Sequence, residues 1–161
     1  MRTTYNAYYP SPLGVFAITC NATAVVRAIF LPPTHSFSDD SLSSFNAPPI
    51  LHEALFQIGQ YFMGKRTTFD LTLDLSGTPF YLKVWRELLN IPFGTTVSYS
   101  AIAKRVGNEK ACRAVGMANN RNPVSIIVPC HRVIGASGQL VGYGGGLHRK
   151  EWLLAWEKSF Q

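Results

Sequence analysis

Residues 98–121 read SYSAIAKRVGNEKACRAVGMANNR, and this stretch decides the fold of the second half of the chain. Ser98 can cap a first helix, because a serine oxygen accepts a hydrogen bond from a free N–H of the first turn. Gly107-Asn108 is a pair typical of tight turns, and a second helix is predicted over residues 109–119. Two short helices joined by a glycine-containing turn indicate a helix-turn-helix motif.

The predicted second helix has two different sides. At about 100° per residue, one side carries Ala111, Ala114, Val115 and Ala118, and the next carries Lys110, Arg113, Met117 and Arg121. Small residues, Gly116 among them, allow close approach of the backbone to a groove, and the cations suit phosphate groups. An ordinary solvated amphipathic helix is the alternative interpretation.

The net charge is unevenly distributed along the 161 residues. The whole chain carries +6, yet residues 1–77 have four Lys and Arg against five Asp and Glu, whereas residues 78–161 have eleven against four. A basic half favours a polyanionic partner, most often nucleic acid, over an acidic protein or an anionic membrane surface. Charge that serves only solubility is the alternative.

Two kinds of apolar segment are missing from the sequence. No apolar run approaches the roughly 18 residues of a membrane span, and residues 1–10 lack the apolar core of a secretory signal. We therefore expect a cytoplasmic protein with no membrane partner and with access to the nucleoid, or a nuclear one if the source is eukaryotic.

The first half of the chain has the pattern of a small sheet with a helix. The predicted elements are strands over residues 15–19, 23–31 and 69–75 and a helix over 51–62, with a long polar loop at 32–49. A seam at Ser76-Gly77-Thr78-Pro79 divides the chain into domains 1–77 and 78–161. The predicted fold class is α+β, with the first domain as scaffold.

Pro129-Cys130-His131 follows an apolar, strand-like run at residues 125–128. A free thiol has a pKa of about 8.5, so a nucleophilic cysteine needs a base, and His131 can serve directly or through a water. Such a histidine usually has an orienting carboxylate, for which Glu151 and Glu157 are candidates. The alternative is a small buried cysteine beside a hydrogen-bonded histidine.

Several strings in a fixed order add to this pair. They are Arg113-Ala114-Val115-Gly116, Asn122-Pro123, Pro129-Cys130-His131-Arg132-Val133, Tyr143-Gly144-Gly145-Gly146-Leu147 and Lys150-Glu151-Trp152-Leu153-Leu154. With them the chain resembles the O6-alkylguanine-DNA alkyltransferase family, closely from Thr78 to Glu157 and more loosely before. The resemblance implies a ribonuclease H-like first domain and a winged-helix-like second domain that contains the helix-turn-helix.

The resemblance also implies an irreversible, single-turnover repair reaction. Cys130 would accept the alkyl group from O6-alkylguanine, and from O4-alkylthymine, after the base is flipped out of the duplex. His131 would take the thiol proton through a water, and Glu157, preferred over Glu151, would orient His131. Asn122 would join the recognition helix to the active-site segment.

The DNA-binding roles follow from the same resemblance. Arg113 would fill the gap left by the flipped base, Tyr99 would crowd the 3′ phosphate, and Ala111, Ala114 and Gly116 would enter the minor groove. Backbone groups of Cys130, Val133 and Gly144 would hold the guanine edge beneath Tyr143 and Gly145. The implied partner is alkylated double-stranded DNA, bound by a monomer, and cooperative binding along DNA stays open.

Neither a cofactor nor a metal is expected. Some members of the family bind zinc in the first domain, but Cys20, His35 and His52 do not reproduce that ligand pattern. Three other functions stay open: a lesion sensor that flips the base without repair, a DNA-binding regulator with a redox-sensing thiol, and a Cys–His hydrolase. The presence of Cys130 argues against the sensor, whose relatives replace the acceptor.

Overall fold

A computed structural model describes residues 2–35 and 46–161 of the chain. Its internal contacts divide the chain into two compact units, Met1–Leu75 and Ser76–Gln161. The polar loop predicted at residues 32–49 lies largely outside the described residues. Within the described ranges, no helix is both long enough and apolar enough to cross a membrane.

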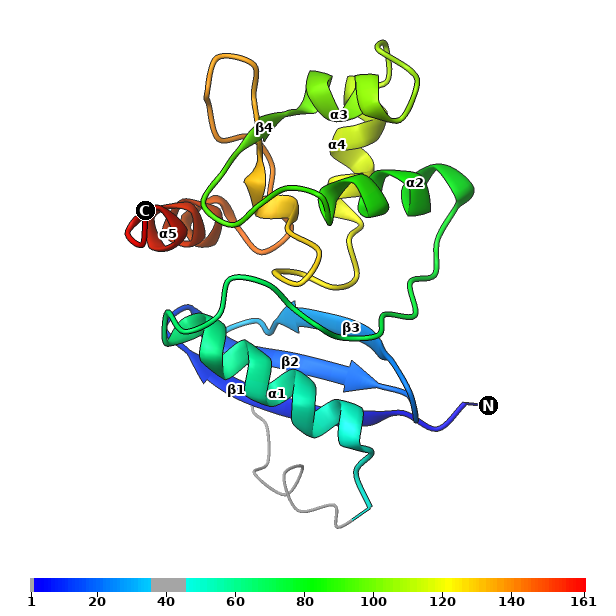
Figure 1. The fold of residues 1–161 in the computed structure, drawn as a ribbon, viewed down its shortest axis with the longest axis vertical. Helices are drawn as coiled ribbons and strands as arrows, with labels where there is room; N and C mark the ends of the chain where they lie inside the picture. Colours follow the sequence, from blue (N-terminus) through cyan, green and yellow to red (C-terminus); the bar gives the residue numbers. More distant parts are fainter. Residues whose placement is uncertain (1, 36–45) are drawn as a thin grey trace. The chain divides into compact units, whose positions relative to one another are not determined.

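The first unit is an antiparallel sheet with one helix against it (Figure 1). The sheet order is β1 (Tyr5–Ser11), β2 (Gly14–Cys20) and β3 (Val25–Phe30), so the predicted hairpin is confirmed. The sequence did not predict β1, which contains Pro10; a proline is tolerated there because β1 is an edge strand. The predicted helix is α1 (Pro49–Phe62).

The strand predicted over residues 69–75 is wrong. Among the residues that the structure describes, the segment pairs with the sheet only at one isolated bridge, where Val25 bonds to Thr72 and Asp74 through backbone groups. Beside it, the buried Gln57 side chain of α1 donates to the Asp70 carbonyl at 3.0 Å and accepts from the Asp70 N–H at 2.9 Å. The backbone groups of Asp70 are therefore satisfied by a side chain instead of by a neighbouring strand.

The second unit is built around three short helices, α2 (Pro79–Leu88), α3 (Tyr99–Arg105) and α4 (Cys112–Asn120), which pack on one another. Ser98 caps α3 by accepting from the Ala101 N–H at 3.1 Å, as predicted. The indole of Trp85 in α2 donates to the Ala118 carbonyl of α4 at 2.8 Å. The fold class is α+β, as expected.

Two details of α4 differ from the prediction. The helix begins at Cys112 and not at Glu109, because the Asn108 side chain accepts from the Lys110 N–H at 3.1 Å and holds a turn there. Ala114 is exposed, while Ala111, Val115 and Ala118 are buried. Ala114 therefore belongs with the cationic side of the helix and not with its core side.

The segment before Cys130 is a tight turn and not the predicted strand-like run. Val128 donates to the Val124 carbonyl at 3.0 Å, and Ile126 has a φ of 71°, a conformation that is costly for a β-branched residue. The chain then forms the 3-10 turn η2 (Cys130–Arg132) and β5 (Val133–Ile134). β5 pairs in parallel with β4 (Val97–Ser98), which the sequence did not predict.

The helix α5 (Leu147–Lys158) completes the second unit and packs against η2. Its buried residues are Lys150, Leu153 and Glu157, which recur at helical spacing on one side. Lys150 and Glu157, at the two ends of this buried side, therefore place two charged groups in the interior next to η2.

The bonds of Gln57 predict a measurable contribution to stability. We expect Gln57→Leu to lower the free energy of unfolding by about 2 kcal/mol, because it leaves both Asp70 backbone groups without their partner. Urea denaturation checks this value. Glu53→Ala is the control, since it removes the other partner of Gln57 from an exposed position and costs less than about 0.5 kcal/mol. Equal losses in the two variants would contradict the assignment.

Candidate functional site

Cys130 lies at the start of η2 and is 3% exposed. Its backbone is held on both sides: the N–H donates to the Val128 carbonyl at 2.8 Å, and the carbonyl accepts from the Asn119 amide at 2.9 Å. Burial raises the pKa of the thiol, and the Asn122 side chain and the Lys150 charge oppose this rise without reversing it. The resting sulfur is therefore a protonated thiol.

Asn122 holds the turn that delivers Cys130. Its amide donates to the Val128 carbonyl at 2.8 Å, and its oxygen accepts from the Val124 N–H at 2.9 Å. These two bonds close the turn that contains Ile126 at positive φ. Asn122 thus connects the end of α4 to the cysteine segment, the position that the resemblance implied.

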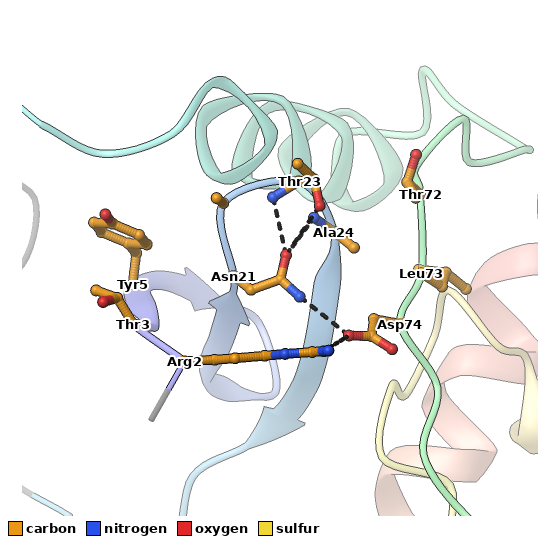
Figure 2. A pocket seen from close by; sticks show the side chains of 10 residues that line it. Arg2, Thr3, Tyr5, Asn21, Thr23, Ala24, Thr72, Leu73 and Asp74 are labelled. Atoms are coloured by element: carbon orange, nitrogen blue, oxygen red, sulfur yellow. Dashed lines mark hydrogen bonds and ion pairs between the residues drawn. The ribbon is translucent and has the colours of Figure 1, made fainter.

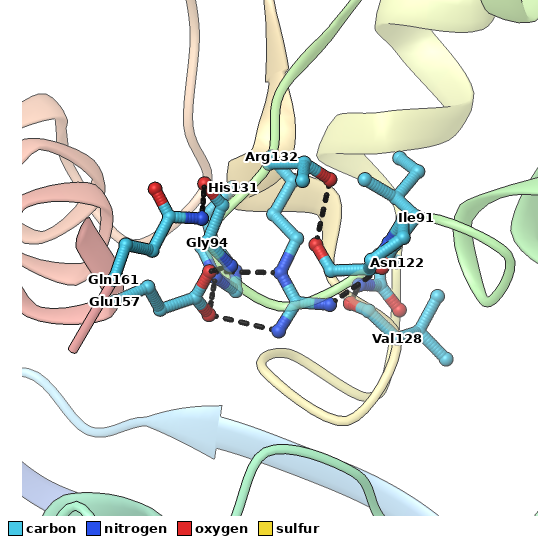
Figure 3. Close-up of polar contacts among 10 residues, drawn as sticks. Ile91, Gly94, Asn122, Val128, His131, Arg132, Glu157 and Gln161 are labelled. Atoms are coloured by element: carbon cyan, nitrogen blue, oxygen red, sulfur yellow. Dashed lines mark hydrogen bonds and ion pairs between the residues drawn. The ribbon is translucent and has the colours of Figure 1, made fainter.

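His131 and Glu157 meet in the interior of the second unit, both with fully buried side chains (Figure 3). His131 Nε2 lies 2.7 Å from Glu157 Oε1. Arg132 completes the cluster by donating from Nε and Nη2 to the two carboxylate oxygens, each at 2.9 Å, and the Gly94 N–H donates at 3.1 Å. A third bond from Arg132 reaches the Ile91 carbonyl at 2.7 Å.

The charges of this cluster determine which nitrogen of His131 carries the proton. Burial raises the pKa of Glu157, but the hydrogen bonds and charges of His131 and Arg132 outweigh it and hold that pKa well below its usual range. Burial lowers the pKa of His131, and Glu157 opposes that fall only in part. A carboxylate only accepts, so the neutral imidazole carries its proton on Nε2. Nδ1 is then left with a free lone pair.

Three buried polar atoms have no hydrogen-bond partner among the described residues: Asn119 Oδ1, His131 Nδ1 and Tyr143 Oη. All three belong to the surroundings of Cys130: Asn119 bonds its carbonyl, His131 follows it, and Tyr143 is close enough for the Cys130 thiolate to raise its pKa, after the larger effect of burial. An unsatisfied buried polar group costs about 1–3 kcal/mol. Three such groups around one thiol indicate a binding site.

Lys150 and Tyr99 lie beside this site. The Lys150 ammonium is buried and donates to the Val133 carbonyl at 2.6 Å, the Val141 carbonyl at 3.1 Å and Tyr99 Oη at 3.4 Å. Tyr99 Oη donates in turn to the Val141 carbonyl at 2.9 Å. Burial lowers the pKa of Lys150, and the negative charge of Cys130 in its thiolate form opposes this fall.

The glycines of the loop at residues 142–146 stand close to their neighbours. A Cβ on Gly145 would come within 2.8 Å of the Tyr143 ring, and one on Gly144 would lie 3.4 Å from the Asn120 carbonyl oxygen. A Cβ on Gly116 of α4 would lie 3.9 Å from the Tyr99 ring. The end of α4, the glycine loop and Tyr99 therefore border the same region.

The structure brings together only some of the predicted site residues. Cys130, His131, Glu157 and Asn122 form one buried cluster, with Tyr99, Val133, Tyr143 and Gly144 around it. Arg113 and Ala114 are exposed on α4, and Ala111 is 8% exposed at the start of that helix. Arg113 and Ala114 thus lie on the surface of α4, Ala111 is buried just before it, and none of the three is hydrogen-bonded to the cluster in the described part of the chain.

Sequence reasoning missed three polar residues of the site: Arg132, Lys150 and Asn119. Arg132 was recognisable as a charge within the apolar stretch 124–134, where a buried cation needs a partner. Lys150 was recognisable from its spacing with Leu153 and Glu157 on α5. Asn119 carries no comparable sequence signal, because asparagines near a helix end are common.

The first unit has a hollow of about 660 Å³, lined by the amino-terminal residues, the turn at 21–24 and the segment 72–74 (Figure 2). Its carboxylate, Asp74, already accepts from Arg2 at 3.2 Å and from Asn21 at 3.1 Å, and no Cys or His lines it. In the described part of the chain, no three His, Cys, Asp or Glu residues gather as metal ligands. The candidate site is accordingly the cluster of the second unit.

The fold and the site define a class: a two-unit α+β protein with a helix-turn-helix and a buried Cys–His–Glu set. Two family models divide the chain in the same order. The 6-O-methylguanine DNA methyltransferase ribonuclease-like domain matches residues 4–75, and the DNA binding domain of the same name matches residues 79–159. The chain belongs to the 6-O-methylguanine DNA methyltransferase family.

Similar proteins carry matching names. A methylated-DNA–protein-cysteine methyltransferase of Mycobacterium leprae is 61% identical over 106 residues, 66% of this chain and 64% of that relative, so this match spans less than two thirds of the relative's length. One of Mycolicibacterium paratuberculosis is 58% identical over 92% of this chain and 88% of the relative. The crystal structure of Mycobacterium tuberculosis OGT in complex with DNA is 44% identical, with a TM-score of 0.84 over 96% of this chain and 93% of that one.

The two lowered pKa values predict how stability depends on pH. The folded-state pKa of His131 lies below its unfolded value of about 6.5, so its stabilising contribution is complete above about pH 6.5 and is lost as the pH falls. The contribution of Glu157 persists to lower pH and is lost below about pH 4.3.

We expect the free energy of unfolding to fall by up to about 1.4 kcal/mol per pH unit between about pH 6.5 and pH 5. Urea denaturation across this range checks the slope. His131→Gln removes the slope in this interval, whereas His148→Gln, at an exposed position, retains it. An unchanged profile in His131→Gln would contradict the neutral, buried His131.

Proposed function

We propose that this chain repairs DNA directly by moving an alkyl group from the O6 atom of guanine to Cys130 Sγ. The observation that carries the proposal is the His131–Glu157 bond, which leaves a free imidazole lone pair on the residue that follows the buried Cys130. The family membership and the names of the relatives support the same reaction. Neither a metal nor a cofactor enters the proposed chemistry.

The proposed reaction begins with loss of the thiol proton and ends with the guanine freed of its alkyl group. The proton of Cys130 passes through a water to His131 Nδ1, and the imidazolium is stabilised by the Glu157 carboxylate. The sulfur attacks the alkyl carbon, forming the S–C bond while the C–O6 bond breaks. The electron pair of that bond goes to guanine. Guanine then takes a proton from His131 and becomes the neutral, unalkylated base, still attached to the DNA.

Three features of the proposed reaction follow from this chemistry. The thioether formed on Cys130 has no good leaving group, so each protein molecule reacts once. Because burial keeps the resting sulfur protonated, the thiol is protected from other electrophiles until the substrate arrives. O4-alkylthymine carries its alkyl group on an equivalent oxygen and is a second substrate of the proposed site.

The proposed DNA contacts start from α4. Its exposed Arg113 replaces the flipped base in the stack, Ala114 and Gly116 approach the minor groove, and Lys110 and Arg121 contact phosphates. Ala111 offers little surface to the groove because it is 8% exposed. The minor groove discriminates sequence poorly, which suits a protein that searches all DNA.

The flipped base is proposed to enter the region bordered by Tyr99 and the glycine loop. Tyr99 crowds the 3′ phosphate and turns its hydroxyl from the Val141 carbonyl to donate to the base, and backbone groups of Cys130, Val133 and Gly144 hold the guanine edge. Tyr143 and Gly145 cover the base. The close approach at Gly145 supports this arrangement, because a side chain there would displace the Tyr143 ring.

The two predicted domains have different proposed tasks. Residues 1–77 are the scaffold, and residues 78–161 bind DNA and react. We propose that the protein acts as a monomer in the cytoplasm with access to the nucleoid, or in the nucleus if its source is eukaryotic.

The mass of the intact protein tests the transfer directly. After incubation with duplex DNA containing O6-methylguanine, we expect a stoichiometric gain of one methylene, mapped to the Cys130 peptide. Cys130→Ala abolishes the gain and retains binding to the lesion. Cys112→Ala is the matched control and retains the gain, because Cys112 lies outside the buried cluster. A folded, DNA-binding protein that gains no mass would favour the lesion sensor or the redox regulator.

The role of Arg113 is tested by comparing two substrates. We expect Arg113→Ala to slow methyl transfer from duplex DNA by about 10- to 100-fold, because the flipped state loses a few kcal/mol of support. Attack on the free modified base needs no flipping and changes little. Lys158→Ala, which removes an exposed cation from α5, affects neither substrate strongly. Equal losses on both substrates in Arg113→Ala would contradict the flipping role.

A further inference from the structure

Asn119 is a buried residue at the end of α4 and is 5% exposed. One polar atom of its side-chain amide has a hydrogen-bond partner and the other has none in the part of the chain that the structure describes. Its amide lies 2.9 Å from the Cys130 carbonyl oxygen. A carbonyl oxygen only accepts, so the atom that faces it must be Nδ2. Oδ1 is then the other atom of the amide, and it has no hydrogen-bond partner among the described residues.

The neighbours of Asn119 are groups that the proposed function assigns to the flipped base. The side chain bonds the Cys130 carbonyl, and the Asn119 amide is near enough to Tyr99 to oppose the rise that burial causes in the Tyr99 pKa. The next residue, Asn120, places its carbonyl oxygen 3.4 Å from the position of a Cβ on Gly144. Asn119 thus lies beside Cys130, Tyr99 and the glycine loop together.

The two carbonyls proposed to hold the guanine edge are each bonded by a buried side chain. Asn119 holds the Cys130 carbonyl, and Lys150 holds the Val133 carbonyl at 2.6 Å. A carbonyl has two lone pairs, so each can accept from the protein and still accept from a ligand. The site therefore presents several fixed acceptors, and Asn119 Oδ1 is one that the protein leaves unused.

A site with fixed hydrogen-bond acceptors favours a ligand that carries hydrogen-bond donors. Guanine carries a 2-amino group with two N–H donors, whereas thymine presents only its O2 acceptor at the corresponding edge. Alkylation at O6 leaves the 2-amino group in place. An acceptor that the protein leaves unsatisfied in its interior is paired when guanine binds, and it stays unpaired when thymine binds.

We propose that Asn119 is a specificity-determining residue, whose Oδ1 accepts one N–H of the 2-amino group of the flipped O6-alkylguanine. Its Nδ2 holds the Cys130 carbonyl in place, and this carbonyl shares the other N–H with the Val133 carbonyl that Lys150 holds. This inference rests on the proposed alkyl transfer. It adds a physical reason for preferring alkylated guanine over alkylated thymine, which is the loss of a buried hydrogen bond with thymine.

The test compares two bases that differ only in the 2-amino group. Single-turnover rates are measured on matched duplexes containing O6-methylguanine or O6-methylhypoxanthine, which lacks that group. We expect wild-type protein to favour O6-methylguanine by about tenfold, the effect of a lost buried hydrogen bond. In Asn119→Leu, which has similar volume and no acceptor, we expect this ratio to fall at least about threefold.

Control variants separate this role from a purely structural one. Asn120→Ala removes the exposed neighbouring amide and keeps the wild-type ratio. Asn119→Asp keeps an acceptor oxygen, so both rates fall while the ratio is retained. If circular dichroism shows that Asn119→Leu is unfolded, Asn119→Ala carries the same comparison.

The outcomes are distinct. A ratio that stays at the wild-type value in Asn119→Leu or Asn119→Ala, with both rates lowered equally, overturns the proposal and leaves Asn119 as a support for Cys130. A wild-type ratio near one also overturns it. Absence of transfer from either base in the wild-type protein contradicts the proposed function itself.

Discussion

The buried carboxylate of Glu157 is the constraint on which the second unit depends. It accepts from His131, from two nitrogens of Arg132 and from the Gly94 N–H, and thus ties α5 to η2 and to the turn after α2. A buried charge without partners is strongly unfavourable, so these segments must come together for the chain to fold. The same bonds hold His131 in one orientation with one tautomer. The hydrogen bonds of Glu157 therefore both stabilise the fold and prepare His131 to act as a general base.

The polar atoms left over from this packing define the site. Most buried polar groups in proteins are paired, yet Asn119 Oδ1, His131 Nδ1 and Tyr143 Oη have no partner among the described residues. Two of them have different capacities: His131 Nδ1 can take a proton, and Asn119 Oδ1 can accept a hydrogen bond from a bound nucleobase. The positive φ of Ile126 adds to the cost of leaving these atoms unpaired, and the two hydrogen bonds of Asn122 hold that turn in place.

Local patterns predicted local structure well. The hairpin of β2 and β3, the helix α1 and the Ser98 cap follow from alternation, helical spacing and capping chemistry, which act within a few residues. The errors occurred where a distant or unexpected partner decided the outcome. Gln57 satisfied the Asp70 backbone, Asn108 delayed the start of α4, and the apolar residues 125–128 formed a turn because Asn122 bonds both of its ends.

The sequence by itself determined the division of charge, the helix pair and the adjacency of Cys130 and His131, because these are properties of composition and of short spacing. It offered both Glu151 and Glu157 as partners of His131, and only the resemblance favoured Glu157. The tertiary structure decided that choice, since Glu157 is on the buried side of α5 and Glu151 is exposed. It also decided the positions of Arg132, Lys150 and Asn119, because burial and hydrogen-bond partners are settled only when residues far apart along the chain pack together.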